Sequence, residues 1–137
     1  MGTVPAQVPG TTPLDTFVNH DLEGVDLSRP EEWQARIPWL PFLPGVEIHR
    51  LYGDGVTGPG AALLRFSPGA KIPEHVHTGF EHIFVLSGSQ VDECGMLLPG
   101  GLRIHPPGSA HSVLSEAGCI VLAIHERPVA FLVPTGE

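Results

Sequence analysis

Cysteine and long apolar runs are both scarce in this sequence. Its 2 cysteines, Cys94 and Cys119, are too few for a disulfide framework, and their spacing is not that of a zinc knuckle. No segment carries enough consecutive apolar residues to cross a bilayer, and the first residues lack the basic region and apolar core of a secretory leader. The sequence therefore predicts a cytoplasmic protein with reduced thiols, in which Cys119 is a core residue and Cys94 lies near an exposed turn.

Positive charge is also scarce. The chain has 7 lysines and arginines against 15 aspartates and glutamates, which gives a formal net charge of −8. A surface with this balance repels phosphate backbones and anionic lipids. We therefore expect neither a nucleic acid nor a membrane surface as a partner.

Glycine and proline, in contrast, are abundant, with 17 and 15 residues that fall between short apolar runs. The chain of 137 residues, 42% of them hydrophobic, is long enough for one domain with a single core. Short strands at this spacing predict an all-β fold, a jelly-roll barrel of antiparallel sheets closed over a cavity. The strand-like runs are 46–52, 61–67, 71–77, 81–87, 90–93, 101–105, 111–114, 119–126 and 129–133.

The first part of the chain lacks this strand pattern. Residues 1–18 are predicted to form an extended arm, and residues 26–36 a short helix with Ser28 as its N-cap. Prolines interrupt residues 39–45, which excludes a helix or a central strand and favours a cover over one edge or mouth of the barrel. We thus divide the chain into an N-terminal arm with one short helix, residues 1–44, and a barrel domain, residues 45–137.

Three histidines and one glutamate are spaced so that they can meet inside the barrel. His75 and His77 share one face of a strand, because side chains alternate with a period of two. Glu81 opens the next apolar run, and His111 follows a tight turn at residues 106–108. Transition metals bind such a set of imidazoles and one carboxylate readily, so the sequence predicts a metal site at His75, His77, Glu81 and His111.

The remaining histidines receive other interpretations. His20 and His49 lie upstream of the predicted metal ligands, and we expect them at the surface or at an interface. His82 faces away from the metal site by strand alternation. His105 and His125 either line the cavity or are ordinary capping and edge residues.

The walls of the cavity can be predicted only from strand alternation. By this criterion, the candidates for an apolar lining are Phe66, Ile83, Val85 and Ile104. Arg65 or Arg103 could neutralise an anionic substrate, and an exposed salt bridge is the alternative for either residue.

Two stretches of the sequence resemble the two cupin motifs. The resemblance covers about residues 45 to 133 and departs from the second motif at Ser115, where the family often has Asn. Residues 44–46, 63–69, 92–93 and 106–109 are similar to the ChrR-like cupin group, which includes anti-sigma sensor domains and relatives of acetylacetone and hydroxyacetophenone dioxygenases. The first motif reads Gly69, five residues, His75-x-His77, three residues, Glu81, six residues and Gly88, and the second reads Gly100, five residues and Pro106-x-Gly108-x-x-His111.

This resemblance implies a metal-dependent, dioxygenase-type enzyme that acts on a small β-dicarbonyl or hydroxyketone compound. Fe(II) is the favoured ion, with Zn, Mn, Ni and Cu as alternatives, and Glu81 would complete the ligand shell or act as a base. The resemblance and the apolar arm also favour a homodimer.

The resemblance leaves two other functions open. One is a zinc-dependent, ChrR-like sensor or ligand-binding module without catalysis. Against it, the first 45 residues contain no Cys and a single His, whereas anti-sigma members depend on a helical zinc-binding segment ahead of the cupin domain. The other is an isomerase, a lyase or a storage protein with a vestigial site.

Overall fold

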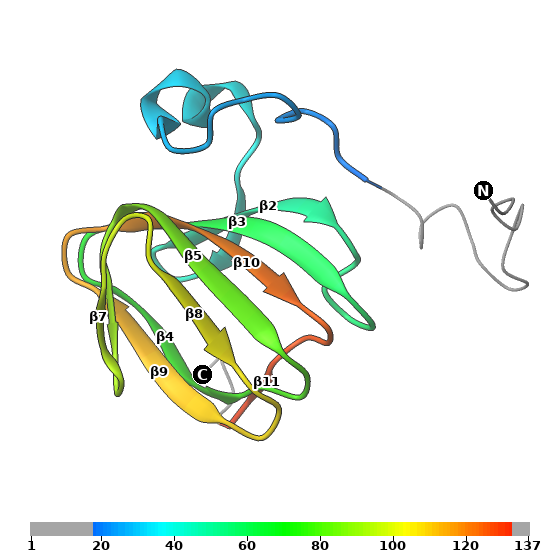
Figure 1. Cartoon of the computed structure of the whole chain (residues 1–137), viewed down its shortest axis with the longest axis vertical. Coiled ribbons are helices and arrows are strands. Elements are labelled where there is room, and N and C mark those ends of the chain that lie inside the picture. Colours follow the sequence, from blue (N-terminus) through cyan, green and yellow to red (C-terminus); the bar gives the residue numbers. More distant parts are fainter. Residues whose placement is uncertain (1–17, 133–137) are drawn as a thin grey trace, which may run out of the picture.

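The computed structural model describes residues 18–132, which form two β-sheets packed face to face (Figure 1). One sheet has the strand order β1-β2-β3-β10-β5-β8, and the other has the order β11-β4-β9-β6-β7. Neighbouring strands are antiparallel, so the predicted all-β jelly roll is confirmed. The strands are β1 Leu40–Leu43, β2 Val46–Tyr52, β3 Gly60–Phe66, β4 Ala70–Val76, β5 Glu81–Gly88, β6 Gln90–Asp92, β7 Gly95–Leu97, β8 Leu102–His105, β9 Ala110–Ser115, β10 Cys119–His125 and β11 Ala130–Phe131.

The main core lies between the two sheets. Alternate residues of each strand point into it, as the period of two requires. On β10, for example, Val121 and Ala123 belong to this core, whereas Ile120 packs on the opposite face of the sheet. Cys119 is buried in the main core, as predicted. Phe66 and Val85, which were candidates for the cavity lining, are packed in this core instead and line neither of the two cavities described below.

A second apolar cluster covers the outer face of the six-stranded sheet. Figure 1 shows the N-terminal segment crossing above β2 and β3 on the side away from the other sheet. The indole of Trp33 is completely buried there, together with Leu63 of β3 and Leu86 of β5. This cover means that both faces of the sheet are shielded from solvent over much of its area.

The short helix predicted for this segment is present as two 3-10 turns, Pro30–Glu32 and Gln34–Arg36. Trp33 separates them with a φ of −132°, and its side chain is buried in the second cluster. Ser28 is not the N-cap: Arg29 holds that position without a side-chain bond, and Ser28 instead donates to the Asp26 carboxylate. Neither turn is long or apolar enough to span a membrane.

The prediction that His49 lies at the surface or an interface is wrong. Its side chain is buried on the outer face of β2, where Nδ1 lies 3.0 Å from the carbonyl oxygen of Pro38 and Nε2 lies 3.2 Å from the Asn19 side chain. The N-terminal segment supplies both partners, so an outward-facing position on this strand is enclosed. His20, in contrast, is exposed beside Glu23.

Two strands were not expected from the sequence. The proline-interrupted segment forms β1, which is the edge strand beside β2 and so agrees with a cover over one edge of the barrel. The short strand β7 pairs with β6 through a turn that contains the exposed Cys94. The predicted arm, up to residue 17, lies outside the described residues.

Candidate metal centre

Three chain segments meet at one end of the barrel interior. His75 on β4 lies directly opposite His111 on β9, and the pairing of these strands shifts register between Ile72 and His75. His77 follows the end of β4, where its backbone N–H donates to the carbonyl of Ser109 at 2.8 Å. Glu81 is the first residue of β5. The strand pairing and the backbone hydrogen bond thus position each of these residues in the protein without a ligand.

The structure brings together the four residues that the sequence singled out. One donor atom from each of the four lies within 4.8 Å of the others, and all four side chains are buried. The ring centroids of His75 and His111 are 4.6 Å apart, and those of His75 and His77 are 5.2 Å apart. The four residues are His75, His77, Glu81 and His111.

The Nδ1 atom of each of these imidazoles is bound by an acceptor outside the cluster. His75 Nδ1 donates to the carbonyl of Pro73 at 2.9 Å, and His77 Nδ1 lies 3.1 Å from the carbonyl of Ser109. His111 Nδ1 lies 2.9 Å from the Asp92 carboxylate. Because carbonyl and carboxylate oxygens only accept, the proton of each neutral ring is on Nδ1 and the lone pair is on Nε2. Each ring therefore presents the atom that a metal needs.

The contact between His77 and Glu81 lacks a hydrogen-bond donor. Nε2 of His77 lies 3.1 Å from Oε1 of Glu81, although both atoms are acceptors when His77 is protonated on Nδ1. Burial raises the pKa of the Glu81 carboxyl, but the His77 hydrogen bond and the neighbouring imidazoles outweigh burial and leave that pKa below its usual value. Either a proton or a cation must lie between these atoms. Two ligands that bind one ion at about 2.1 Å and at right angles are about 3 Å apart, so the observed gap fits a shared ion.

His105 and Asp92 complete the surroundings of the cluster. The His105 ring stacks on His77 at 4.4 Å, so of the two roles left open for His105 the structure supports the cavity-lining one. Burial lowers the pKa of His105 to about 4, and the neighbouring imidazoles of His111 and His77 add to this shift, so His105 is neutral at neutral pH. Asp92 was not predicted as a site residue. It faces inward because Val91 points outward, and the signals in the sequence are this alternation and the similarity of residues 92–93 to the ChrR-like group.

A second set of donor atoms also lies within 4.8 Å, and it consists of Asp92, His105 and His111. Asp92 is already engaged, because Arg103 donates to one of its oxygens at 2.7 Å and His111 donates to the other. The pKa of the Asp92 carboxyl is raised by burial, yet the bonds from His111 and Cys94 and the charge of Arg103 bring it below its usual value. Asp92 therefore acts as an orienting acceptor for His111, in the way that outer partners hold metal-binding histidines.

Two adjoining cavities reach the cluster. The smaller, of about 60 Å³, is lined by His75, Glu81 and His111, and the larger, of about 130 Å³, extends away from them. Ile83 lines the smaller cavity, as predicted. Ile104 does not, because β8 turns Arg103 and His105 inward and leaves Ile104 51% exposed. The apolar prediction was wrong there because a polar pair occupies the inner positions of β8.

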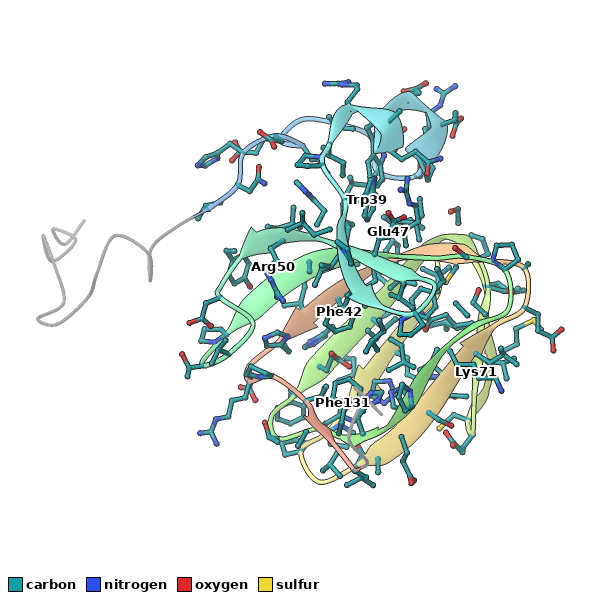
Figure 2. The ribbon with its side chains drawn as sticks, turned by 180° about the vertical axis from the view of Figure 1, so that it is seen from behind. Trp39, Phe42, Glu47, Arg50, Lys71 and Phe131 are labelled. Atoms are coloured by element: carbon teal, nitrogen blue, oxygen red, sulfur yellow. The ribbon has the colours of Figure 1, made fainter. Side chains whose placement is uncertain are left out.

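The two arginines that were considered for substrate binding lie on opposite faces of the sheet. Arg65 is on the outer face, where it donates to Glu47 at 2.7 Å and lies over the ring of Trp39 at 4.4 Å. Figure 2 shows its two partners, Trp39 and Glu47, close together on this side of the sheet. Arg103 faces inward but is held by Asp92. Neither guanidinium is directed into the two cavities.

Comparison with known proteins identifies relatives that share this fold. The family model of the ChrR cupin-like domain matches residues 33–129. The anti-sigma-E factor ChrR of Cereibacter sphaeroides is 33% identical over 92 residues, which cover 60% of this chain and 43% of that protein. The chain therefore spans less than half the length of this curated relative.

Comparison with solved structures also finds relatives that share this fold. The complex of Rhodobacter sphaeroides SigE with the anti-sigma ChrR contains a chain that is 27% identical, with a TM-score of 0.62 and coverage of 70% of this chain and 53% of that one. An acetylacetone dioxygenase from Acinetobacter johnsonii is 16% identical, with a TM-score of 0.64 and coverage of 72% and 74%. At this identity, the second match shows a common fold alone.

Proposed function

The chain belongs to the ChrR cupin-like family, and from this membership and the geometry of the site we propose that it binds one divalent transition-metal ion. The proposed ligands are Nε2 of the three histidines and the carboxylate of the glutamate: His75, His77, His111 and Glu81. Fe(II) is the ion we favour, with Zn, Mn, Ni and Cu as alternatives, because ligands of these types do not distinguish sharply among these metals.

One observation carries this proposal: three imidazoles have Nδ1 held by outer acceptors, and their Nε2 atoms face one buried carboxylate. A core that packed for stability alone would not gather four acceptors without a donor among them, since unsatisfied buried polar atoms are costly. A divalent cation satisfies all four at once. The outer acceptors also keep the rings in place while the ion binds.

We further propose that the protein is a dioxygenase-type enzyme acting on a small β-dicarbonyl or hydroxyketone compound. The ion would supply Lewis acidity and redox capacity toward oxygen-containing ligands. The chain supplies a cavity next to the cluster, and its walls include the apolar side chains of Leu64 and Phe131. Because the pKa of Glu81 is low, its carboxylate is charged at neutral pH and is able to accept the acidic proton of such a substrate.

The similarity to an anti-sigma factor favours a second candidate, a zinc-dependent sensor or ligand-binding module without catalysis. In this case the ion would hold β4, β5 and β9 together, and a ligand or oxidant would change a protein surface. A sigma factor is then a candidate partner, because a structural relative was solved in complex with one. The two candidates differ in metal identity and in turnover.

A homodimer is the proposed assembly for either function. The last strand of the six-stranded sheet, β8, has a free edge in the described residues and exposes Leu102 and Ile104. Exposed apolar side chains beside an unpaired strand edge are a common basis for self-association. Light scattering on a size-exclusion column would measure the mass directly, and a mass of one chain would contradict the dimer.

Elemental analysis of untagged protein tests the metal proposal, and oxygen uptake by the Fe(II)-reconstituted protein with β-diketones and hydroxyacetophenones tests the activity. The enzyme proposal predicts near-stoichiometric metal and substrate-dependent oxygen consumption that is lost in His111→Ala. Tightly bound zinc without turnover would favour the sensor. Absence of any metal from the purified and the reconstituted protein would contradict both.

A further inference from the structure

The larger cavity contains a cationic side chain that the proposed metal chemistry does not use. Arg50 lies on β2 between Ile48 and Tyr52 and lines the cavity together with Ala62 and Leu64. Strand alternation places Arg50 on the inner face, because Val46 and Ile48 of the same strand are core residues and His49 faces outward. An arginine at an inward position among the apolar side chains of Ile48, Ala62 and Leu64 requires an explanation.

Arg50 has no carboxylate partner in the described residues. The ion pairs of residues 18–132 engage other arginines, namely Arg29, Arg65 and Arg103. The nearest acidic side chain of the following loop, Asp54, instead accepts the backbone N–H groups of Val56 and Thr57 at 2.8 and 2.9 Å. A partly buried guanidinium without a counterion is unfavourable unless a ligand supplies the charge.

The loop after β2 is shaped around this guanidinium. A Cβ atom on Gly55 would lie 2.5 Å from Cζ of Arg50, and the positive φ of 74° at Gly55 also favours glycine. Gly55 itself lines the cavity. The backbone therefore lies directly against Arg50 and restricts where its guanidinium can point.

His125 on β10 lines the same end of the cavity, and its ring lies against Gly60 of β3. Its Nε2 atom is buried and has no hydrogen-bond partner in the part of the chain that the structure describes. Burial lowers the pKa of His125, Glu81 opposes this shift and Arg50 adds to it, so the ring is neutral at neutral pH and the positive charge at this end is that of Arg50. A buried imidazole nitrogen without a partner is costly, and a rotation of the His125 side chain toward the cavity that it lines would let this nitrogen donate one hydrogen bond.

The two cavities adjoin one another between Arg50 and the metal cluster. They share the lining residues Phe42, Leu64, Glu81, Val129 and Phe131. In Figure 2, Arg50 comes from β2, Phe42 from β1 and Phe131 from β11, and the last two are the outermost strands at one side of the two sheets. Taken together, the two cavities have Arg50 at one end, the aromatic and aliphatic side chains that they share in the middle, and the proposed metal ligands at the other end.

We infer that Arg50 and His125 form an anion subsite, and that the substrate or ligand is a short amphipathic molecule with chelating oxygens at one end and a carboxylate at the other. The planar guanidinium of Arg50 binds the carboxylate with two parallel N–H groups, and His125 donates one further hydrogen bond. The aromatic rings contact the carbons that connect the two ends of the molecule. This inference rests on the proposed metal site for the chelating end, whereas the anion subsite itself requires no metal.

Calorimetry with the zinc-loaded protein tests the inference with a matched pair of probes. The acid 4,6-dioxoheptanoate carries a β-diketone and a carboxylate, and its methyl ester carries the same diketone without the charge. We expect wild-type protein to bind the acid about 10- to 100-fold more tightly than the ester, and Arg50→Met to abolish this preference while it leaves the affinity for the ester unchanged. Equal affinities of the wild type for acid and ester would overturn the inference.

The matched control is Arg65→Gln, which removes a guanidinium from the opposite face of the same sheet. It should keep the full preference for the acid. Thermal melting and zinc stoichiometry report whether Arg50→Met folds, and Arg50→Lys serves if it does not. Lysine keeps the charge but loses the fork, so this variant should retain only part of the preference, and retention of all of it would contradict the role assigned to the guanidinium.

Pentanoate separates failure of the subsite from failure of the metal site. This carboxylate has no chelating oxygens, so its binding to chelator-treated protein reports the anion subsite alone. We expect pentanoate to shift the nuclear magnetic resonance signals of the His125 ring in the wild type and not in Arg50→Met. If both proteins respond alike, the inference fails even where zinc binds; if only the diketone ester fails to bind, the proposed function fails and the anion subsite stands.

Discussion

The outer face of the six-stranded sheet and the interior between the two sheets use the same residue types in different ways. On the outer face, His49 has partners for both ring nitrogens, and Arg65 has both a carboxylate and an aromatic ring. On the inner side, each histidine of the metal cluster has a partner outside the cluster for one nitrogen, and Arg50 has no carboxylate in the described residues. His49 and Arg65 are satisfied by the chain itself, whereas the histidines of the cluster and Arg50 leave polar groups free for something else to bind.

This difference separates structural from functional polar residues. A buried histidine with two protein partners contributes a pair of hydrogen bonds to stability. A buried histidine with one partner and a lone pair facing three other acceptors is arranged for a ligand instead. Residue type and burial are the same in the two cases, so the distinction depends on counting partners for each nitrogen.

Removing one histidine from the outer face and one from the interior should give the largest contrast. His111→Ala is expected to lower zinc affinity by more than the ~10- to 100-fold that follows loss of an outer partner, because a ligand itself is lost. His49→Ala should leave zinc affinity unchanged and lower the free energy of unfolding by about 1–3 kcal/mol, since the hydrogen bonds to the N-terminal segment are lost. Competitive zinc titration and denaturant unfolding measure the two effects.

Equal changes of zinc affinity and of unfolding free energy in the two histidine variants would contradict the contrast between the outer face and the interior. In particular, undiminished zinc binding by His111→Ala would remove this residue from the ligand set. A loss of zinc affinity in His49→Ala, with the fold intact, would mean that the outer face also contributes to the site.

Asp92→Asn should give the next largest effect. The amide can no longer hold the proton of His111 Nδ1 as a carboxylate does, so the Nε2 lone pair is less well oriented, and we expect zinc affinity to fall by about 10- to 100-fold. Asp26→Asn, on the exposed N-terminal segment, is the control and should bind zinc like the wild type. Equal zinc affinities of Asp92→Asn and the wild type would show that Asp92 does not orient His111.

The sequence predicts this inner cluster well because the information is local. Two histidines of one strand share a face by alternation, and the prolines and glycine before His111 define the turn that returns the chain to them. The prediction for His49 failed because the partners that enclose it, Asn19 and Pro38, come from a segment without a regular pattern. Asp92 was missed because its partner His111 lies on another strand, and nothing in the sequence joins them.

The metal-free protein should lose stability in mild acid because His105, in the interior between the sheets, is buried as a neutral imidazole. The folded-state pKa of His105 is about 4, below the 6.5 of a free imidazole, so the neutral ring contributes its stability fully above pH 6.5. That contribution declines as the pH falls from 6.5 toward 4, because the unfolded chain takes up the proton first. Unfolding of chelator-treated protein from pH 7.5 to 4.5 should therefore show a shallower decline in His105→Gln than in the wild type. A parallel decline in both would assign the acid sensitivity elsewhere.

Removal of the ion pair between Arg65 and Glu47 on the outer face should have the smallest effect on stability. Arg65 and Glu47 are both partly exposed, so Arg65→Gln is expected to lower the free energy of unfolding by only about 0–1 kcal/mol, beyond any lost contact with Trp39. The change should shrink further at high salt, where exposed charges are screened. A large effect on zinc or probe binding would show that the two faces are coupled.

X-ray absorption at the zinc edge of the protein loaded with one equivalent of zinc tests the metal site most directly. We predict a first shell of nitrogen and oxygen at about 2.0–2.1 Å with imidazole scattering from three rings, which falls to two rings in His111→Ala. A shell that contains sulfur at about 2.3 Å, or a wild-type spectrum with fewer imidazoles that His111→Ala leaves unchanged, would contradict the ligand set on which this account depends.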